Sequence, residues 1–141
     1  MPEEQGDAGP RGFQLDATVD TGVRTIGFKL SNASGFMIRY GATVLQLNQW
    51  YHVTGVYDAQ AQTLDVYLNG VPDNGDLVGT VSSSQVDAPL DVLIGERADY
   101  QMYPFIGTID EVRIYNRAIT PAQVSCPAVQ RTLAWCAQSV F

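Results

Sequence analysis

The sequence predicts an all-β protein: an antiparallel sandwich or barrel of short strands, followed by a short helix or tail. Two observations support this fold class. From Phe13 onward, runs rich in β-branched and aromatic residues recur about every ten residues and are separated by glycine, asparagine or serine. Several of these runs alternate apolar and polar residues, as strands with one buried face do. At 141 residues, the chain fits a single domain with one core.

Three segments follow from the composition. Residues 1–12 contain prolines, glycines and acidic residues without periodicity and are predicted to be a flexible lead. Residues 13–125 form the predicted β-domain, and residues 126–141 form a C-terminal tail of helix-like character. Within the β-domain the predicted strands are 23–30, 35–40, 43–47, 50–58, 63–69, a short edge strand at 77–81 and a buried strand at 90–95.

The run 63–69 gives the clearest hairpin signal. Leu64, Val66 and Leu68 share one face, and Asp65 and Tyr67 share the other. The Asn-Gly pair that follows supplies a turn in which both residues adopt positive φ.

The strand predicted at 50–58 carries two aromatic residues that we expect in the core. Trp50 and Tyr57 lie on the most regular strand of the sequence, which favours burial. His52 is the single histidine of the chain, and we expect it to have a structural role. One histidine and two cysteines do not supply the usual four ligands of a structural zinc site.

Residues 105–120 are predicted to form a strand that leads into a helix. Alternation along this strand places Asp110 on the same face as Val112 and Ile114. A carboxylate on an apolar face is costly unless it accepts hydrogen bonds, meets a cation or binds a metal. The alternative is a β-bulge at Asp110 and Glu111 that turns the carboxylate outward.

The C-terminal residues contain a helix start and two cysteines. Thr120, Pro121 and Gln123 have the spacing of a capping box. A continuous helix would place the Cα atoms of Cys126 and Cys136 about 15 Å apart, whereas a disulfide needs roughly 4.4–6.8 Å. The two arrangements exclude each other, and we favour a disulfide with a broken tail.

The charge and hydropathy exclude several kinds of partner. A net charge of −7 with a single lysine disfavours nucleic acids and anionic membranes. No apolar run approaches the roughly 20 residues that cross a bilayer, and residues 1–12 lack the basic and apolar regions of a signal peptide. No serine lies in a nucleophile-elbow pattern.

The motifs WYHVTGVYD, LDVYLNG, LIG and FIGTIDEVRIYNRAIT occur in this order along the chain. Over residues 23–124, the sequence resembles the laminin-G-like jelly-roll family, which has the concanavalin A-like lectin and glucanase fold. The resemblance implies a two-sheet antiparallel jelly-roll sandwich that is extracellular or on the cell surface, often binds glycans and often holds calcium. In that family the aspartate that matches Asp110 is often a calcium ligand, so the resemblance implies Asp110 as a metal residue.

The chain departs from this family at its N-terminal side. The family's Phe-Asp-Gly strand and the tryptophan-containing strand after it have no counterpart here, which leaves the predicted sheet with an open edge. Three arrangements would complete the sheet: a strand within 13–20, a second copy of the chain in a homodimer, or part of a longer parent protein.

The loop 96–104 is the predicted ligand site because it mixes charges with aromatics. Arg97, Asp99, Tyr100 and Tyr103 suit a sugar, since aromatic faces stack on pyranose rings and planar polar groups bond hydroxyl pairs. The Glu-x-Asp-x-x-Glu strand of related glycosidases is absent from the sequence. The sequence therefore predicts a noncatalytic carbohydrate-binding module that partners a glycan or polysaccharide, with a protein-interaction or self-assembly module as the alternative.

Overall fold

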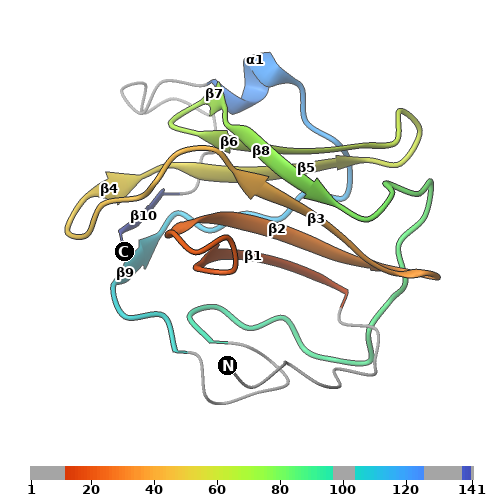
Figure 1. Cartoon of the computed structure of the whole chain (residues 1–141), viewed down its shortest axis with the longest axis horizontal. Coiled ribbons are helices and arrows are strands. Elements are labelled where there is room, and N and C mark those ends of the chain that lie inside the picture. Colours follow the sequence, from red (N-terminus) through yellow and green to blue (C-terminus); the bar gives the residue numbers. More distant parts are fainter. Residues whose placement is uncertain (1–11, 97–103, 126–137, 141) are drawn as a thin grey trace.

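The structure is a computed structural model that describes residues 12–96, 104–125 and 138–140. Antiparallel strands form nearly all of its regular structure, and the described residues contain one short helix (Figure 1). The predicted all-β sandwich with a short C-terminal helix is confirmed.

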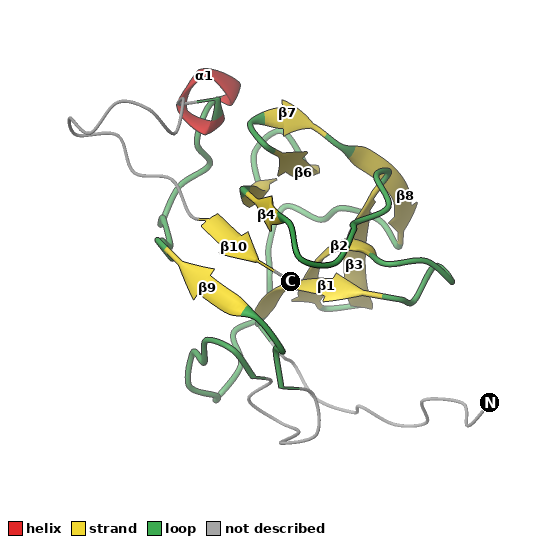
Figure 2. Cartoon of the chain, turned by 90° about the vertical axis from the view of Figure 1, so that its left-hand side faces the viewer, coloured by secondary structure: helices red, strands yellow, loops and turns green. Residues whose placement is uncertain are grey.

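The strands belong to two facing layers. In the first layer, the four-stranded sheet has the order β1-β2-β3-β8. The second layer contains the sheet β5-β6-β7, and a small sheet with the order β4-β10-β9 lies beside it (Figure 2). The bounds are β1 (Phe13–Thr18), β2 (Thr25–Asn32), β3 (Gly35–Gly41), β4 (Trp50–Tyr51), β5 (Val53–Asp58), β6 (Thr63–Leu68), β7 (Val71–Pro72), β8 (Asn74–Val78), β9 (Thr108–Asp110), α1 (Pro121–Val124) and β10 (Gln138–Val140).

The main core lies between the two layers and follows from the alternation of the strands. In β2, Ile26, Phe28 and Leu30 are buried and belong to this core. Opposite them β6 contributes its apolar face, as the hairpin pattern predicts. The buried members of the core are Ile26, Phe28, Leu30, Met37, Leu45, Tyr51, Leu64, Val66, Leu68 and Val81.

The two layers approach most closely where an aromatic ring meets a glycine. A methyl group on Gly55 of β5 would lie 2.6 Å from Cγ of Phe28, so only glycine leaves room for the ring. On the other strand of this hairpin, Val66 pairs with Gly55 and is fully buried. The Phe28 ring therefore fills the space that a side chain at residue 55 would occupy.

A smaller apolar cluster covers the other face of the β5-β6 hairpin. Val56 and Tyr67 are buried against Val124 of α1, with Ala118 and Ile119 packed alongside. The capping box predicted for this helix is present, because Thr120 Oγ1 accepts from Gln123 N and Gln123 Oε1 accepts from Thr120 N. Helix α1 thus packs on the second layer through Val124.

The Asn69-Gly70 turn is confirmed and also explains why the strand predicted at 50–58 is interrupted. Asn69 has φ of 52° and Gly70 has φ of 79°, as a turn between β6 and β7 requires. His52 N donates to Asn69 Oδ1 at 3.0 Å, and His52 O accepts from Asn69 N at 2.7 Å. The backbone N–H and C=O of His52 are therefore both hydrogen-bonded to Asn69. β4 ends just before His52, and β5 begins just after it.

The predicted core position of Trp50 is wrong. Its side chain is 53% exposed, whereas its neighbour Tyr51 is buried in the core. Tyr57 is half-buried and packs against the core, and its hydroxyl donates to Ser82 O at 2.8 Å. Trp50 points outward because the opposite face of the strand, which carries Tyr51, packs on the core.

Two predicted strands are wrong. Residues 43–47 form a loop, because Leu45 N donates to Arg24 O and Thr43 N and Oγ1 donate to the Asp73 carboxylate. Residues 90–95 form no strand, and Val92 is 60% exposed. In both segments, the apolar pattern is compatible with a strand, but within the described residues no neighbouring strand pairs with it.

The remaining predictions concern the edge strands of the first sheet and the two ends of the chain. The predicted edge strand at 77–81 exists as β8, which ends at Val78 because Gly79 turns with φ of 77°. The edge of the first sheet is completed by β1, the first of the three arrangements that the sequence leaves open. Cys126 and Cys136 lie outside the described residues, as do 1–11, so the disulfide and the flexible lead stay predictions.

The packing of Phe28 over Gly55 gives a direct test of the interlayer contact. We expect Gly55→Ala to lower the free energy of unfolding by about 1–3 kcal/mol, because the buried ring must move. Chemical denaturation of the parent and the variant measures this loss. In a Phe28→Leu background, the same substitution should cost clearly less, and equal costs in the two backgrounds would contradict the contact.

Candidate functional site

The predicted ligand loop is described only at its base. Arg97, Asp99, Tyr100 and Tyr103 lie outside the described residues. On either side of them, Phe105 N donates to Gly95 O at 2.7 Å, and Gly95 has φ of 87°. The described residues on either side of the loop are therefore held together.

Asp110 ends β9 and is exposed, so its predicted burial on an apolar face is wrong. Its Oδ1 accepts from Glu111 N at 2.8 Å, and Glu111 has φ of 53°. This left-handed residue ends the strand, and the following Val112 and Ile114 are exposed as well. The outward carboxylate, which was the alternative reading of the sequence, is the arrangement found.

Asp110 is the metal residue that the family resemblance implies. Calcium takes six to eight oxygen ligands, normally including several carboxylates. Within the described ranges, no three His, Cys, Asp or Glu side chains lie close enough to hold a metal ion. The Asp110 carboxylate is exposed, and calcium at this position stays a prediction from the family resemblance.

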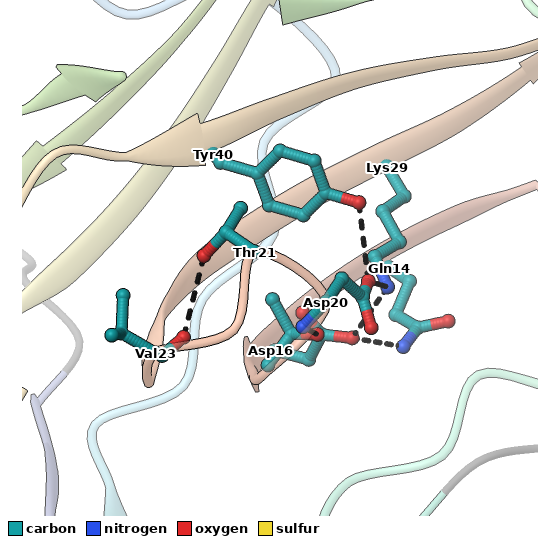
Figure 3. Close-up of polar contacts among 8 residues, drawn as sticks. Gln14, Asp16, Asp20, Thr21, Val23, Lys29 and Tyr40 are labelled. Atoms are coloured by element: carbon teal, nitrogen blue, oxygen red, sulfur yellow. Dashed lines mark hydrogen bonds and ion pairs between the residues drawn. The ribbon is translucent and has the colours of Figure 1, made fainter. Parts of the chain in front are cut away.

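A second polar site, which the sequence analysis did not predict, lies on the face of the first sheet that points away from the core. It contains Gln14, Asp16, Asp20, Lys29 and Tyr40, which we term the Lys29 cluster (Figure 3). Gln14 and Asp16 alternate along β1, and Lys29 and Tyr40 come from β2 and β3. Two signals indicate such a site in retrospect: the alternation along β1 and the position of the single lysine on a strand.

Lys29 holds the cluster together. Its Nζ lies 2.7 Å from Asp20 Oδ2 and 3.4 Å from Asp16 Oδ2. Tyr40 Oη donates to Asp20 Oδ2 at 3.1 Å, and Gln14 Nε2 donates to Asp16 Oδ2. One ammonium therefore pairs with two carboxylates, one from β1 and one from the loop after it.

Gly27 provides the floor of the cluster. A methyl group there would lie 2.5 Å from Asp16 Oδ1 and 3.3 Å from Lys29 Cε, so the bare backbone lets these side chains lie across the sheet. Two buried oxygens beside this floor, Asp16 Oδ1 and Thr25 Oγ1, have no hydrogen-bond partner among the described residues.

The electrostatics of the two carboxylates differ because their burial differs. Burial raises the pKa of Asp16 above its ordinary value, and this effect outweighs the attraction of Lys29. Burial acts in the same direction on Asp20, but hydrogen bonds with Lys29 and Thr18 outweigh it and lower the pKa. Desolvation opposes the charge of Lys29, yet the two carboxylates raise its pKa.

This arrangement is that of an ion network. An acid and a base that hydrolyse a glycoside must flank the scissile bond with water or substrate between them. In the cluster, the Lys29 ammonium lies between Asp16 and Asp20, donates a hydrogen bond to Asp20 and forms an ion pair with Asp16. The cluster therefore joins β1, β2, β3 and the loop after β1, and it presents the partly exposed Asp20 to solvent.

The chain matches the family model described as the concanavalin A-like lectin/glucanases superfamily, a laminin G-like family, over residues 3–125. The chain belongs to this family. No curated protein and no solved structure matched the chain. The laminin G-like resemblance is thus confirmed, and membership makes the domain a lectin-like or interaction module.

Laminin G-like domains are typically extracellular. In the part of the chain that the structure describes, no helix has the length and apolar character needed to cross a membrane.

The Lys29 cluster predicts a pH-dependent loss of stability. We expect Lys29→Met to lower the free energy of unfolding at neutral pH by about 1–3 kcal/mol, less than for a fully buried pair because Asp20 is partly exposed. Denaturation at several pH values measures this loss, and Lys29→Arg, which keeps the charge, serves as the matched control.

The sign of the pH dependence follows from the two carboxylates. Asp16, with its raised pKa, takes up a proton first on acidification, and Asp20 loses its stabilising contribution as the pH falls through its lowered pKa. Below both pKa values, Asp16 and Asp20 are protonated and no longer repel each other. The loss of unfolding free energy in Lys29→Met should therefore shrink toward acidic pH. A loss that is independent of pH would contradict the ion network.

Proposed function

We propose that this domain is a noncatalytic carbohydrate-binding module. The observation that carries the proposal is the family match over residues 3–125, because members of this superfamily often bind carbohydrates or proteins. The two-layer sandwich supports the proposal, since such folds present ligand-binding loops from a rigid scaffold.

The loop 96–104 is the binding site in this proposal. Tyr100 and Tyr103 stack on the apolar face of a sugar ring, and Arg97 and Asp99 form hydrogen bonds with neighbouring hydroxyls. The hydrogen bond between Phe105 N and Gly95 O supports this role because it closes the base of the loop. A closed base lowers the entropy that a ligand must remove on binding.

The arrangement of the acidic residues supports a noncatalytic role. Asp110 and Glu111 are adjacent, with the backbone turning between them, and Glu111 forms an ion pair with Arg113 at 2.5 Å. Asp16 and Asp20 are joined by Lys29. Neither pair has the open space between carboxylates that glycoside hydrolysis needs.

Calcium at Asp110 stays a prediction from the family resemblance, and the carbohydrate proposal does not depend on it. If loop carbonyls complete a site there, added calcium raises Tm by mass action. A calcium titration of Tm tests this, with Asp110→Asn as the control. Equal melting with calcium and with a chelator contradicts a metal at Asp110.

A glycan array tests the proposed function. We expect the parent domain to bind at least one class of array glycan, and Tyr100→Ala and Arg97→Ala to weaken that binding about tenfold or more. Tyr115→Ala is the matched control, because Tyr115 is 42% exposed and lies outside the loop. Melting curves of all variants show whether the fold is retained.

Two results would overturn the proposal. A parent domain that binds no glycan on the array removes the carbohydrate function. Equal weakening by Tyr115→Ala and Tyr100→Ala would place the binding outside the loop 96–104.

A second candidate function, an assembly module that recognises a second copy of the chain, is favoured by a different observation. Apolar side chains that the sequence predicts in strands are exposed: Val92 at 60%, Ile94 at 62% and Ile114 at 60%. Ile106, just before β9, is 88% exposed. A second copy that paired with these segments would remove this apolar surface from water.

Sedimentation over a range of protein concentrations tests the assembly candidate. A dimer that Ile114→Asp disrupts and that binds no glycan supports assembly in place of carbohydrate binding. A monomer at all concentrations rules it out.

A further inference from the structure

We infer that Asn32, at the tip of the β2-β3 hairpin, is a site of N-linked glycosylation, a covalent modification that is separate from the proposed binding function. Asn32, Ala33 and Ser34 form the acceptor sequence Asn-x-Ser, in which the middle residue is not proline. No other asparagine of the chain is followed two residues later by serine or threonine. The sequence therefore offers a single acceptor of this kind.

The acceptor sequence lies on the tight turn between two strands. Asn32 ends β2 and pairs with Gly35, the first residue of β3, so Ala33 and Ser34 form the turn between them. Gly35 has φ of 128°, a backbone conformation that residues with a side chain rarely adopt. The turn lies at the end of the two longest described strands, on the opposite side of the molecule from β9 (Figure 1).

The tip of the hairpin is open to solvent. Ala33, Ser34 and Gly35 are exposed, and Asn32 is half-buried. A methyl group added to Gly35 would meet no heavy atom of a described residue within 4 Å beyond its own chain neighbours. No described segment therefore crowds the turn, and a glycan attached to Asn32 has room in the folded domain.

The hydrogen bonds of the Asn32 amide are compatible with an attached sugar. Its Oδ1 accepts from Ser34 N at 2.9 Å, which ties the amide to the residue that supplies the hydroxyl group of the acceptor sequence. Its Nδ2 donates to Thr80 O at 3.3 Å. This nitrogen carries two hydrogens, and a sugar replaces only one of them. The remaining hydrogen can keep the bond to Thr80.

The modification joins a sugar to Asn32 Nδ2. The donor is an oligosaccharide linked through a diphosphate to a polyprenyl lipid, and a transferase of the secretory pathway catalyses the step. Nδ2 attacks the anomeric carbon of the first sugar, so a C–N bond forms and the bond from that carbon to the phosphate oxygen breaks. The lipid diphosphate leaves with the electron pair, and the proton displaced from Nδ2 passes to a base of the transferase.

The typical location of the family agrees with this modification. Laminin G-like domains are typically extracellular, and the acceptor sequence is used in surface loops of secreted proteins. The inference does not depend on whether the loop 96–104 binds a glycan, because the sugar on Asn32 is attached by an external enzyme.

Secretion of the full chain from a eukaryotic cell line, behind a cleavable signal peptide, tests the inference. We expect the secreted protein to migrate more slowly in gel electrophoresis than the same chain made in bacteria, and treatment with an N-glycosidase to abolish the difference. Because this enzyme converts the linked asparagine to aspartate, we expect mass spectrometry of the released peptides to show the conversion at Asn32.

Variants of the turn identify the acceptor. We expect Asn32→Gln and Ser34→Ala to lose the modification completely, and Ser34→Thr to keep it, because threonine also supplies the hydroxyl group. Ser34→Ala keeps the hydrogen bond within the turn, since Ser34 donates through its backbone nitrogen, and it carries the test even where Asn32→Gln fails to fold. Asn116→Gln is the matched control, because Asn116 is exposed in a loop and has alanine two residues later.

Two results would overturn the inference. The first is a secreted parent chain without a sugar at Asn32, from cells that glycosylate a control glycoprotein. The second is a sugar that persists in Asn32→Gln or Ser34→Ala, because the acceptor then lies outside this Asn-x-Ser sequence. Neither result bears on the proposed function, since the glycan array is probed with the unmodified chain made in bacteria.

Discussion

The close approach of the two layers is the constraint on which the rest of the structure depends. The Phe28 ring lies directly over the backbone of Gly55, and β6 closes the core with the fully buried Leu64 and Val66. Dense packing at this point fixes the register of the hairpin relative to the first sheet. Arg39 adds a polar link between the layers, because its Nε donates to Leu64 O at 2.8 Å.

The inner faces of the two layers form the core, and polar side chains can therefore gather on the outer faces. On the first sheet, alternation gathers the Lys29 cluster over the bare backbone of Gly27. On the second layer, α1 covers Val56 and Tyr67 and leaves Trp50 uncovered. The same periodicity of two thus produces both the core and the polar cluster on the outer face of the first sheet.

The exposed apolar segments after β8 distinguish this chain from a fully paired sandwich. A strand needs a neighbour to satisfy its backbone groups, and residues 90–95 have none in the described part of the chain. Short, poorly paired strands such as β9 are typical of the edge of a sheet. This region is where an assembly partner or a further strand would gain the most from pairing.

Local patterns determined much of the fold without any structure. The Leu64-Val66-Leu68 alternation, the Asn69-Gly70 turn and the capping box at Thr120 each depend on residues a few positions apart, and all three are present. The family also follows from the sequence, because its motifs occur in order.

Tertiary structure decided the outward position of Trp50, the left-handed turn that exposes Asp110, and the meeting of Asp16, Asp20 and Lys29. These features depend on which strands become neighbours and which faces are covered. Such long-range pairings are not encoded in the periodicity of any one segment.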